Sequence, residues 1–190
     1  WQYKEYKSSH NFVDLISTTY TKKQYLFERI DTCNGKVIKV IFVGRIDKQK
    51  GIEDIAEAVL LLSQQGYNIK FEVAGPLVES DNVIEKIDKF YQENKIQNKF
   101  VYKGFLSFGS DLFEFYRSAD IFVNASRLTE GFPRTIKEAM SQSLPVVTTN
   151  VGGIKYELTD NLNTVLCKKN SPESIAEKIG LLIQNAELRK

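Results

Sequence analysis

The sequence predicts an α/β fold: a doubly wound parallel sheet with helices on both faces. Short apolar runs rich in β-branched residues alternate with stretches of helical periodicity from residue 37 onwards. This alternation is typical of strand–helix units with parallel strands. Residues 144–148 (LPVVT) are almost continuously apolar, as expected for a strand buried between two layers of helices. In such sheets ligands bind beyond the carboxyl ends of the strands.

The first 36 residues carry weaker signals. Residues 12–18 (FVDLIST) predict a short strand and residues 22–29 a helix. Asn34-Gly35 marks a turn.

The next two units each consist of a strand and an amphipathic helix. Residues 37–43 (VIKVIFV) and 69–74 (IKFEVA) are rich in β-branched residues and predict buried strands. Apolar residues recur at helical spacing after each strand, which predicts one helix ending near Gly66 and another over residues 83–91.

The second half of the chain continues the alternation. Residues 100–102 and 121–123 predict short strands on either side of a helix at residues 111–117. Pro133 suits the first position of a helix, because the N–H it lacks would be unpaired there. The helix predicted to begin at Pro133 has one apolar face, formed by Ile136, Ala139 and Met140.

The strand at 144–148 leads into a glycine turn, Gly152-Gly153. A short strand near Val165 and a helix over residues 172–184 complete the predicted fold. Ser171 precedes this last helix and is its predicted N-cap.

Composition narrows the function classes. The chain has 190 residues, 42% hydrophobic and 26% charged, with a net charge of +2, which gives no indication of a nucleic-acid partner. The single histidine, His10, cannot build a histidine-based metal site, and Cys33 and Cys167 have no metal-ligand spacing around them. No apolar run approaches the roughly 20 residues of a membrane-spanning helix.

Two glutamates flank a predicted helix N-terminus. Glu130 lies before Pro133, and Glu138 lies inside the helix with its side chain inclined back toward the same end. The free N–H groups of a helix N-terminus bind anions, whereas a carboxylate accepts hydrogen bonds from hydroxyls. An anion attached to hydroxyl groups is a nucleotide or a sugar phosphate.

Two cations lie on the loop after the first buried strand, in the segment VGRIDKQKG. Arg45 offers a planar fork to phosphate oxygens and Lys50 a mobile point charge. Gly44 and Gly51 allow a tight turn and close backbone approach. The loop therefore faces the predicted ligand edge of the sheet with two positive charges.

These segments resemble a known family. EGFPRTIKEAM followed by LPVVTTNVGG resembles the Glu, seven residues, Glu signature of the retaining GT-B glycosyltransferases (glycosyltransferase group 1, family 4-like), and GRIDKQKG resembles their G-R-x-x-x-x-K-G motif. Ser143 replaces a usual glycine, and Ala125-Ser126 replaces Pro-Ser. The resemblance implies a Rossmann-like donor-binding domain, one half of a GT-B fold, at residues 34–190, with residues 1–33 a remnant of the N-terminal domain and linker.

The resemblance also implies roles for individual residues. Arg45 and Lys50 would hold the donor's diphosphate and neutralise it as it leaves, and Glu130 would face the transferred sugar as a positioning carboxylate; these three are the expected catalytic residues. Glu138 would bind the ribose hydroxyls. The remaining expected donor-binding residues are Gly44, Gly75, Gly104, Phe105, Phe132, Pro133, Arg134 and Thr135. Tyr116 and Asp120 resemble the family's Y-x-x-A-D element. Packing and helix termination explain both residues, so we assign them no role in the chemistry.

The implied reaction transfers a hexose from a UDP- or GDP-linked sugar to a hydroxyl acceptor, with retention and without a metal or cofactor. The acceptor would be a glycan or a lipid-linked glycan, bound through the missing N-terminal domain, in surface polysaccharide synthesis. We expect a cytoplasmic protein, at the inner membrane face if the acceptor is lipid-linked. We also expect this chain to bind nucleotide weakly and to be inactive by itself.

Three alternatives remain open. A nucleotide-sugar 2-epimerase of the same fold would bind the same donor, but with a different arrangement of glutamate and histidine. A non-catalytic nucleotide-binding module would fit the isolated chain, although not the presence of both Glu130 and Glu138. A dehydrogenase would require the G-x-G-x-x-G fingerprint, which the sequence lacks.

Overall fold

A six-stranded parallel sheet, in the order β3-β2-β1-β4-β5-β6, organises the chain. The computed structural model describes residues 26–29, 31–128 and 131–189. The strands are β1 (Ile38–Val43), β2 (Ile69–Ala74), β3 (Phe100–Tyr102), β4 (Ile121–Asn124), β5 (Val146–Thr149) and β6 (Val165–Cys167). The strand order reverses between β1 and β4, and a crevice for ligands is expected at such a switch point.

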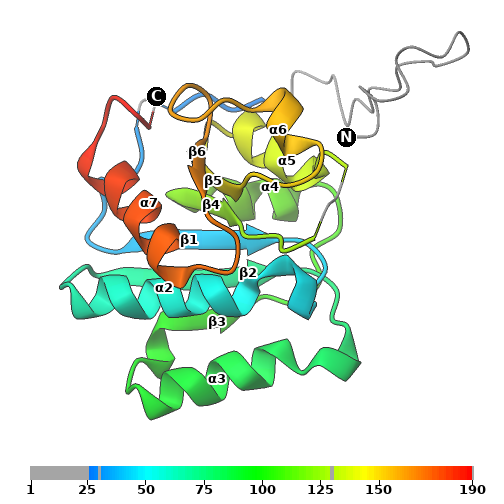
Figure 1. Cartoon of the computed structure of the whole chain (residues 1–190), viewed down its shortest axis with the longest axis vertical. Coiled ribbons are helices and arrows are strands. Elements are labelled where there is room, and N and C mark those ends of the chain that lie inside the picture. The colour runs from blue at the N-terminus through cyan, green and yellow to red at the C-terminus, as the bar shows by residue number, and fades with distance from the viewer. Residues whose placement is uncertain (1–25, 30, 129–130, 190) are drawn as a thin grey trace, which may run out of the picture.

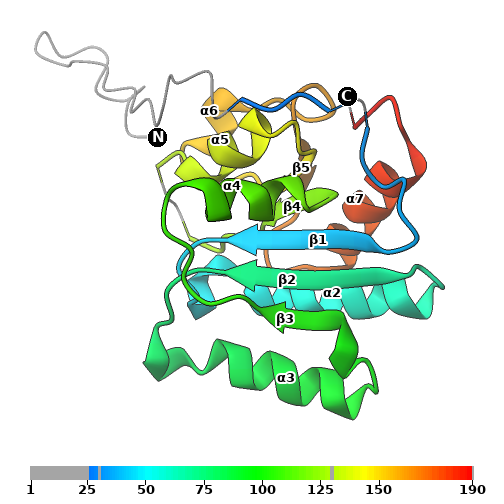
Figure 2. The same ribbon diagram turned by 180° about the vertical axis from the view of Figure 1, so that it is seen from behind.

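Helices cover both faces of this sheet. One face carries α2 (Ile52–Gln64), α3 (Val83–Glu93) and α7 (Pro172–Gln184), and the other carries α4 (Ser110–Arg117), α5 (Arg134–Ser141) and α6 (Ile154–Glu157) (Figures 1 and 2). Short 3-10 helices, η2 (Lys48–Lys50), η3 (Glu79–Asp81) and η4 (Gln97–Lys99), lie in the connections. The predicted doubly wound, Rossmann-like α/β fold is confirmed.

Strand β1 shows why the strand segments are apolar on both sides. Val40 and Phe42 belong to the core beneath α2, α3 and α7, whereas Ile41 and Val43 belong to the core beneath α4, α5 and α6. Successive side chains of a strand point to opposite faces, so a strand between two helical layers is apolar at consecutive positions, as residues 40–43 of β1 are. All parallel strands end at one edge, toward which the arrowheads of β1–β3 point in Figure 2.

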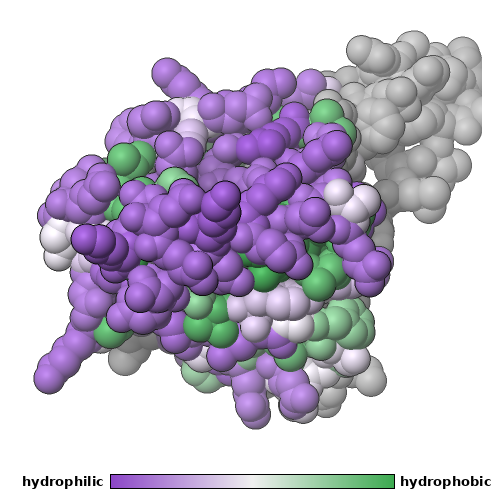
Figure 3. Space-filling view, turned by 90° about the horizontal axis from the view of Figure 1, so that it is seen from below, coloured by the Kyte–Doolittle hydropathy of each residue, from purple (hydrophilic) through white to green (hydrophobic). Residues whose placement is uncertain are grey.

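Helix α3 has one buried apolar face and one exposed polar face. Its residues Val83, Ile84, Ile87 and Tyr91 are buried, and most of the remaining positions are charged. Seen from the side on which α3 lies, the surface is mainly hydrophilic, with small separate hydrophobic areas (Figure 3). Within the described part of the chain, no helix is both long and apolar enough to cross a lipid bilayer.

Most predicted elements are observed within two residues of their predicted bounds. Strand β5 begins at Val146, two residues later than predicted, and α5 begins after Pro133, which serves as its N-cap residue. Helix α6 was not predicted. The helix predicted over residues 22–29 is wrong for residues 26–29, which form no regular element, while residues 12–18 lie outside the described residues.

Ser171 is the N-cap of α7, as predicted. Its hydroxyl accepts a hydrogen bond from the Ser174 N–H at 3.2 Å, and Pro172 occupies the first turn. The side chain thereby satisfies one of the N–H groups that a helix N-terminus leaves unpaired.

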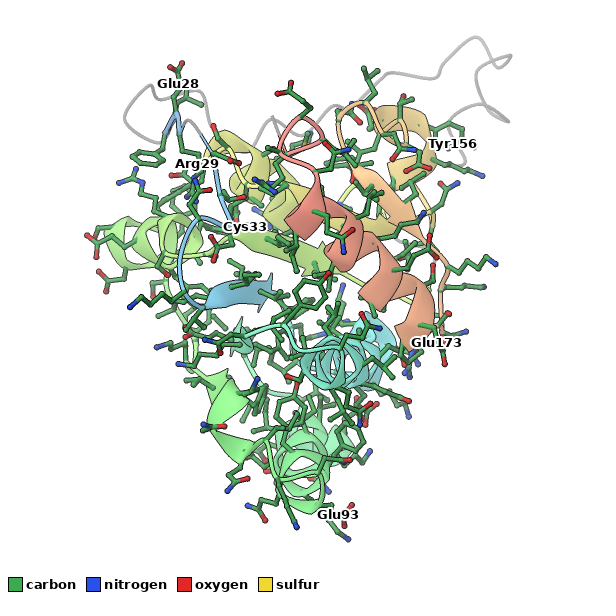
Figure 4. The ribbon with its side chains drawn as sticks, turned by 90° about the vertical axis from the view of Figure 1, so that its left-hand side faces the viewer. Glu28, Arg29, Cys33, Glu93, Tyr156 and Glu173 are labelled. Carbon is green, nitrogen blue, oxygen red and sulfur yellow. The ribbon has the colours of Figure 1, made fainter. Side chains whose placement is uncertain are left out.

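Residues 26–29 bind to the carboxyl ends of two helices instead of forming a helix of their own. The Arg29 guanidinium donates to the carbonyls of Gln142 (3.0 Å), Ala119 (2.8 Å) and Arg117 (3.0 Å), which close α5 and α4. The Phe27 N–H donates to the Ser141 carbonyl at 2.9 Å. Figure 4 shows Arg29 directed into the structure, whereas Glu28 projects outward. A cation among carbonyls at helix carboxyl ends is electrostatically favourable.

This contact bears on the predicted domain division at residue 33. Arg29 contacts the carboxyl ends of α4 and α5, and Asp31 forms two hydrogen bonds, both 2.8 Å, with Arg189 near the other end of the chain. The division itself stays a prediction.

We expect Arg29→Ala to lower the free energy of unfolding by about 2–3 kcal/mol, because three helix-end carbonyls lose a charged donor. Urea denaturation followed by circular dichroism measures this change. Lys89→Ala is the control, since Lys89 lies on the exposed face of α3 with one 3.9 Å ion pair and should change stability by no more than about 0.5 kcal/mol. Equal midpoints for the two variants would contradict the role given to Arg29.

Candidate functional site

A cavity of about 270 Å³ lies beyond the carboxyl ends of β1 and β2, beside the start of α5. It brings together seven of the residues that the sequence predicted for the donor site: Gly44, Arg45, Gly75, Phe105, Arg134, Thr135 and Glu138. These residues come from four separate segments of the chain, so their meeting at one edge follows from the parallel arrangement of the strands.

The other predicted residues do not line this cavity. Lys50 lies half-buried at the end of η2, on the same loop as Arg45. Gly104 directly precedes Phe105, and its carbonyl accepts a hydrogen bond from the Gly75 N–H at 2.9 Å. Phe132 and Pro133 directly precede α5, and the Phe132 ring lies 5.0 Å from the Lys137 ammonium. Glu130 lies outside the described residues.

Glycine is required where the loops after β1 and β2 meet. Gly75 has a φ of +148°, and a Cβ added to it would lie 1.8 Å from the Gly44 carbonyl oxygen. Gly51 plays the same part on the other side of the β1 loop: its φ is +65°, and an added Cβ would lie 2.2 Å from the Ala125 carbonyl oxygen. Backbone therefore packs directly against backbone around the cavity.

Asp47 organises the loop that carries Arg45 and Lys50. One of its carboxylate oxygens accepts a hydrogen bond from the Arg45 guanidinium, and the other accepts from the Gln49 N–H at 2.9 Å. Asp47 is buried, whereas the Arg45 side chain is 62% exposed. The buried carboxylate thus fixes the base of an otherwise solvent-facing cation, a role that the sequence analysis missed although Asp47 lies inside the predicted motif.

A second ion pair joins the loops on the two sides of the switch point. Arg127, in the loop after β4, binds both carboxylate oxygens of Asp54, in the first turn of α2, at 3.0 and 2.6 Å. The Arg127 guanidinium also donates to the Lys48 carbonyl at 3.2 Å, and the backbone N–H of Arg127 donates to the Gln49 carbonyl at 2.8 Å. This bidentate pair raises the pKa of Arg127. Nothing in the sequence pattern linked these two residues.

The turn after β5 supports the approach to α5. A Cβ added to Gly153 would lie 3.0 Å from both the Gly131 carbonyl carbon and the Phe132 nitrogen. The glycine turn predicted from the sequence therefore allows the backbone of residues 131–132 to pack closely just before the helix. Arg134 and Thr135 follow in the first turn of α5, whose N–H groups have no partners within the helix.

Glu138 lies on the fifth position of α5 and lines the cavity although it is only 7% exposed. Its Oε2 accepts a hydrogen bond of 2.8 Å from the hydroxyl of Tyr116 on α4. Burial raises the pKa of the Glu138 carboxyl, and the Tyr116 hydrogen bond and the nearby Arg134 oppose that rise. The sequence analysis gave Tyr116 a packing role only and did not place its hydroxyl on Glu138.

The remaining wall of the cavity is apolar. Phe105 and Phe108 both line it with rings that are 65% and 52% exposed, and Leu106 and Leu112 lie beside them. Phe108 was not predicted; its ring contacts Phe113 edge to face, with 5.4 Å between centroids. Exposed aromatic rings at a cavity are suited to contact with another flat, partly apolar group.

The charged groups of the cavity are few. Among the described residues that line it, the charged side chains are Arg45, Arg134 and Glu138, two cations and one carboxylate. Within residues 26–29, 31–128 and 131–189, no three His, Cys, Asp or Glu side chains gather as a metal ion would require. The expectation that the site uses no metal or cofactor stays a prediction.

Comparison with protein families decides the family. Residues 27–190 match the family described as glycosyl transferases group 1. The chain is a member of this family. The motifs that suggested the resemblance, the β1 loop and the segment from Glu130 to Gly153, both lie within the matched residues.

Sequence relatives of this glycosyltransferase domain are longer proteins. The chain is 34% identical over 152 residues to the capsular polysaccharide biosynthesis glycosyltransferase CapM of Staphylococcus aureus, covering 78% of this chain and 37% of CapM. It is 33% identical over 150 residues to an uncharacterised glycosyltransferase of Methanocaldococcus jannaschii, covering 79% of this chain and 39% of that protein. The chain thus spans well under half the length of these relatives.

Solved structures identify the part of a GT-B glycosyltransferase to which this chain corresponds. The C-terminal domain of the group 1 glycosyltransferase LpcC of Francisella tularensis has a TM-score of 0.72 and 26% identity, covering 80% of this chain and 78% of that one. A glycosyltransferase of Rickettsia africae has a TM-score of 0.73 and 26% identity, covering 82% of this chain and 40% of that one. The chain therefore corresponds to the C-terminal domain of a GT-B glycosyltransferase.

The close approach of Gly75 to Gly44 is testable with a matched pair of glycines. Gly75 and Gly109 have nearly equal φ angles, +148° and +151°, but a Cβ at Gly109 would meet nothing within 4 Å. Gly109→Ala should therefore cost only the backbone strain, about 1–3 kcal/mol. Gly75→Ala should cost about 1–3 kcal/mol more, because the clash displaces the Gly44 carbonyl. Chemical denaturation compares the two; equal losses would argue against a steric constraint at Gly75.

The ion pair across the switch point is testable with a double-mutant cycle. Asp54→Ala, Arg127→Ala and the double variant should show a coupling free energy of about 1–3 kcal/mol in unfolding experiments. Arg127→Lys should recover only part of it, because an ammonium cannot bind both carboxylate oxygens in the guanidinium geometry. Additive effects of the two single substitutions would show that the pair contributes no stability.

Proposed function

We propose that this domain binds the donor of a glycosyltransferase reaction, a nucleoside diphosphate sugar, in the cavity at the carboxyl edge of the sheet. The observation that carries the proposal is the meeting of Arg45, Arg134 and Glu138 beside exposed aromatic rings in one cavity. A nucleoside diphosphate sugar has the matching groups: a doubly charged diphosphate, a ribose with two neighbouring hydroxyls and a flat base.

The cationic side of the cavity suits the diphosphate. Guanidinium groups bind phosphate oxygens in a planar, bidentate geometry, and the first-turn N–H groups of α5 add donors together with the positive end of the helix dipole. We assign the diphosphate to Arg45, Arg134 and the start of α5, with Lys50 on the same loop as Arg45. Positive charge fixed in place before the reaction stabilises the negative charge that develops on the departing diphosphate.

The carboxylate and the aromatic rings suit the nucleoside. A carboxylate is an acceptor for two hydroxyl donors, so we assign the ribose to Glu138. The base would lie against Phe105 and Phe108, with the backbone near Gly104 and Gly75 at its edge. Glu130 is assigned to the transferred sugar as a positioning carboxylate.

The finer features of the reaction belong to the same proposal. We infer transfer of a hexose to a hydroxyl with retention at the anomeric carbon, on a glycan or lipid-linked acceptor held by the N-terminal half of the complete enzyme, on the cytoplasmic side of the membrane. The name of CapM, a relative in capsular polysaccharide biosynthesis, supports a role in surface glycan synthesis. HepE of Anabaena, which shares the fold at 20% identity and a TM-score of 0.73, was solved with UDP and glucose, which makes UDP the first nucleotide to test.

Calorimetric titration with UDP and GDP, and then with UDP-glucose and GDP-mannose, tests the donor site. We expect one nucleotide to bind, and Arg45→Ala and Glu138→Gln each to weaken it by roughly 10- to 100-fold, because each removes a hydrogen-bonding group of a charged contact. Lys48→Ala is the matched control: it removes an exposed cation from the same loop without touching the cavity.

Three outcomes of these experiments would contradict the proposal or favour an alternative function. Unchanged affinity in both cavity variants would overturn the assignment. Nucleotide binding with no preference for a sugar-linked form, in the complete enzyme as well, would favour a non-catalytic module. Release of UDP or GDP from the donor by this chain alone would contradict the expectation that it is inactive without its N-terminal half.

A further inference from the structure

Two buried side chains from different helices form a hydrogen bond directly behind the cavity. Tyr116 on α4 is fully buried, and its hydroxyl donates to Glu138 Oε2 at 2.8 Å. The same hydroxyl lies 3.4 Å from the Thr135 carbonyl, at the first turn of α5. A hydrogen bond to a charged acceptor in surroundings this dry is stronger than the same bond in water.

Aromatic packing holds the Tyr116 ring in position. The Tyr116 ring packs against Phe113 and Phe122, with centroid distances of 6.3 and 6.0 Å. Tyr116 lies in the core beneath α4, α5 and α6, together with Ile136 and Ala139 of α5. This packing keeps the ring, and with it the hydroxyl oxygen, in place beside Glu138.

The second carboxylate oxygen of Glu138 is differently placed. Among the hydrogen bonds of the described residues, Glu138 Oε1 takes part in none, yet it is not one of the fully buried atoms that lack a partner. It therefore keeps some solvent contact, and the residue lines the cavity. One oxygen is held by the protein core, and the other is available to a ligand.

We propose that Tyr116 is a positioning residue for the nucleotide: it holds one oxygen of Glu138 so that the other accepts a hydrogen bond from a ribose hydroxyl. This rests on the proposed donor site. Tyr116 itself contacts no ligand; it acts through the orientation and the charge state of Glu138.

The charge state matters because only the ionised carboxyl is a pure acceptor. Among the described residues that line the cavity with Glu138, the other charged groups are Arg134 on its own helix and Arg45 from the β1 loop. Burial raises the pKa of Glu138, and the Tyr116 hydrogen bond opposes that rise. Without the hydroxyl the pKa rises further, so Glu138 becomes protonated at a higher pH and binding is lost from the acidic side sooner.

The simpler account is that Glu138 merely satisfies a buried tyrosine hydroxyl. Tyr91 provides the comparison, because it is also fully buried and its hydroxyl donates to the Ala56 carbonyl at 2.9 Å, away from the cavity. Tyr91→Phe and Tyr116→Phe remove the same group from the same kind of environment. A purely structural role predicts that the two variants behave alike.

The first measurement needs no ligand. The pKa of Glu138 is read from carbon-13 NMR of the glutamate side-chain carboxyls across a pH titration, with Glu138→Gln identifying its signal. We expect the pKa of Glu138 to be higher in Tyr116→Phe than in the unsubstituted chain, and unchanged in Tyr91→Phe. An unchanged pKa in Tyr116→Phe would overturn the proposal.

The second measurement is the affinity for UDP and GDP as a function of pH. Tyr116→Phe should weaken binding by roughly 3- to 30-fold and shift the acidic limb of the profile to higher pH, whereas Tyr91→Phe should leave both unchanged. In the double variant Tyr116→Phe/Glu138→Gln, the tyrosine substitution should add almost nothing to the loss caused by Glu138→Gln. Additive losses would overturn the proposal.

The two measurements separate this inference from the donor site on which it rests. Failure of the unsubstituted chain to bind either nucleotide, together with a shifted Glu138 pKa in Tyr116→Phe, would remove the donor site and with it the ligand role of Tyr116. Normal nucleotide binding together with identical pH profiles in both tyrosine variants would leave the donor site standing and remove Tyr116 from it.

Discussion

The ion pair between Arg127 and Asp54 joins the segments that follow β1 and β4, on either side of the point where the strand order reverses. The strand order reverses between β1 and β4, so the loops that follow these two strands lead to helices on opposite faces of the sheet. Arg127 draws them together with two hydrogen bonds to Asp54 and one to the Lys48 carbonyl. The β1 loop is therefore tied to the loop that follows β4, while the parallel arrangement of the strands brings Arg45, Arg134 and Glu138 to one cavity.

Hydrogen bonds to buried partners orient the charged side chains of Arg45 and Glu138. Asp47 is buried beneath the exposed Arg45, and Glu138 is buried against Tyr116 while lining the cavity. In each case a buried hydrogen-bonding partner limits the orientations of a charged group before any ligand arrives. Preorganisation of this kind reduces the ordering that binding would otherwise require, and it explains why Asp47 and Tyr116, to which the motifs gave no ligand role, belong to the site.

The sequence predicted the fold and most of the cavity because both depend on local patterns. Apolar runs such as residues 37–43 reveal strands buried on both sides, and the parallel arrangement then brings the strand ends to one edge, where Arg45 and Glu138 were expected to meet. The contacts that were missed join residues far apart in the chain. Arg127 and Asp54, or Tyr116 and Glu138, have no periodicity relating them, and their pairing becomes visible only when side-chain directions are known. The helix predicted over residues 22–29 is wrong for residues 26–29 for the same reason, since tertiary hydrogen bonds from Phe27 and Arg29 override a weak local preference.

Helices α4 and α5 are joined at two levels: by Arg29 at their carboxyl ends and by the Tyr116–Glu138 hydrogen bond further along. These two contacts hold α5 to the carboxyl-terminal part of α4, one at the end of α5 and the other at the wall of the cavity. The segment that precedes β1 and the Glu138 carboxylate at the wall of the cavity are therefore anchored to the same pair of helices.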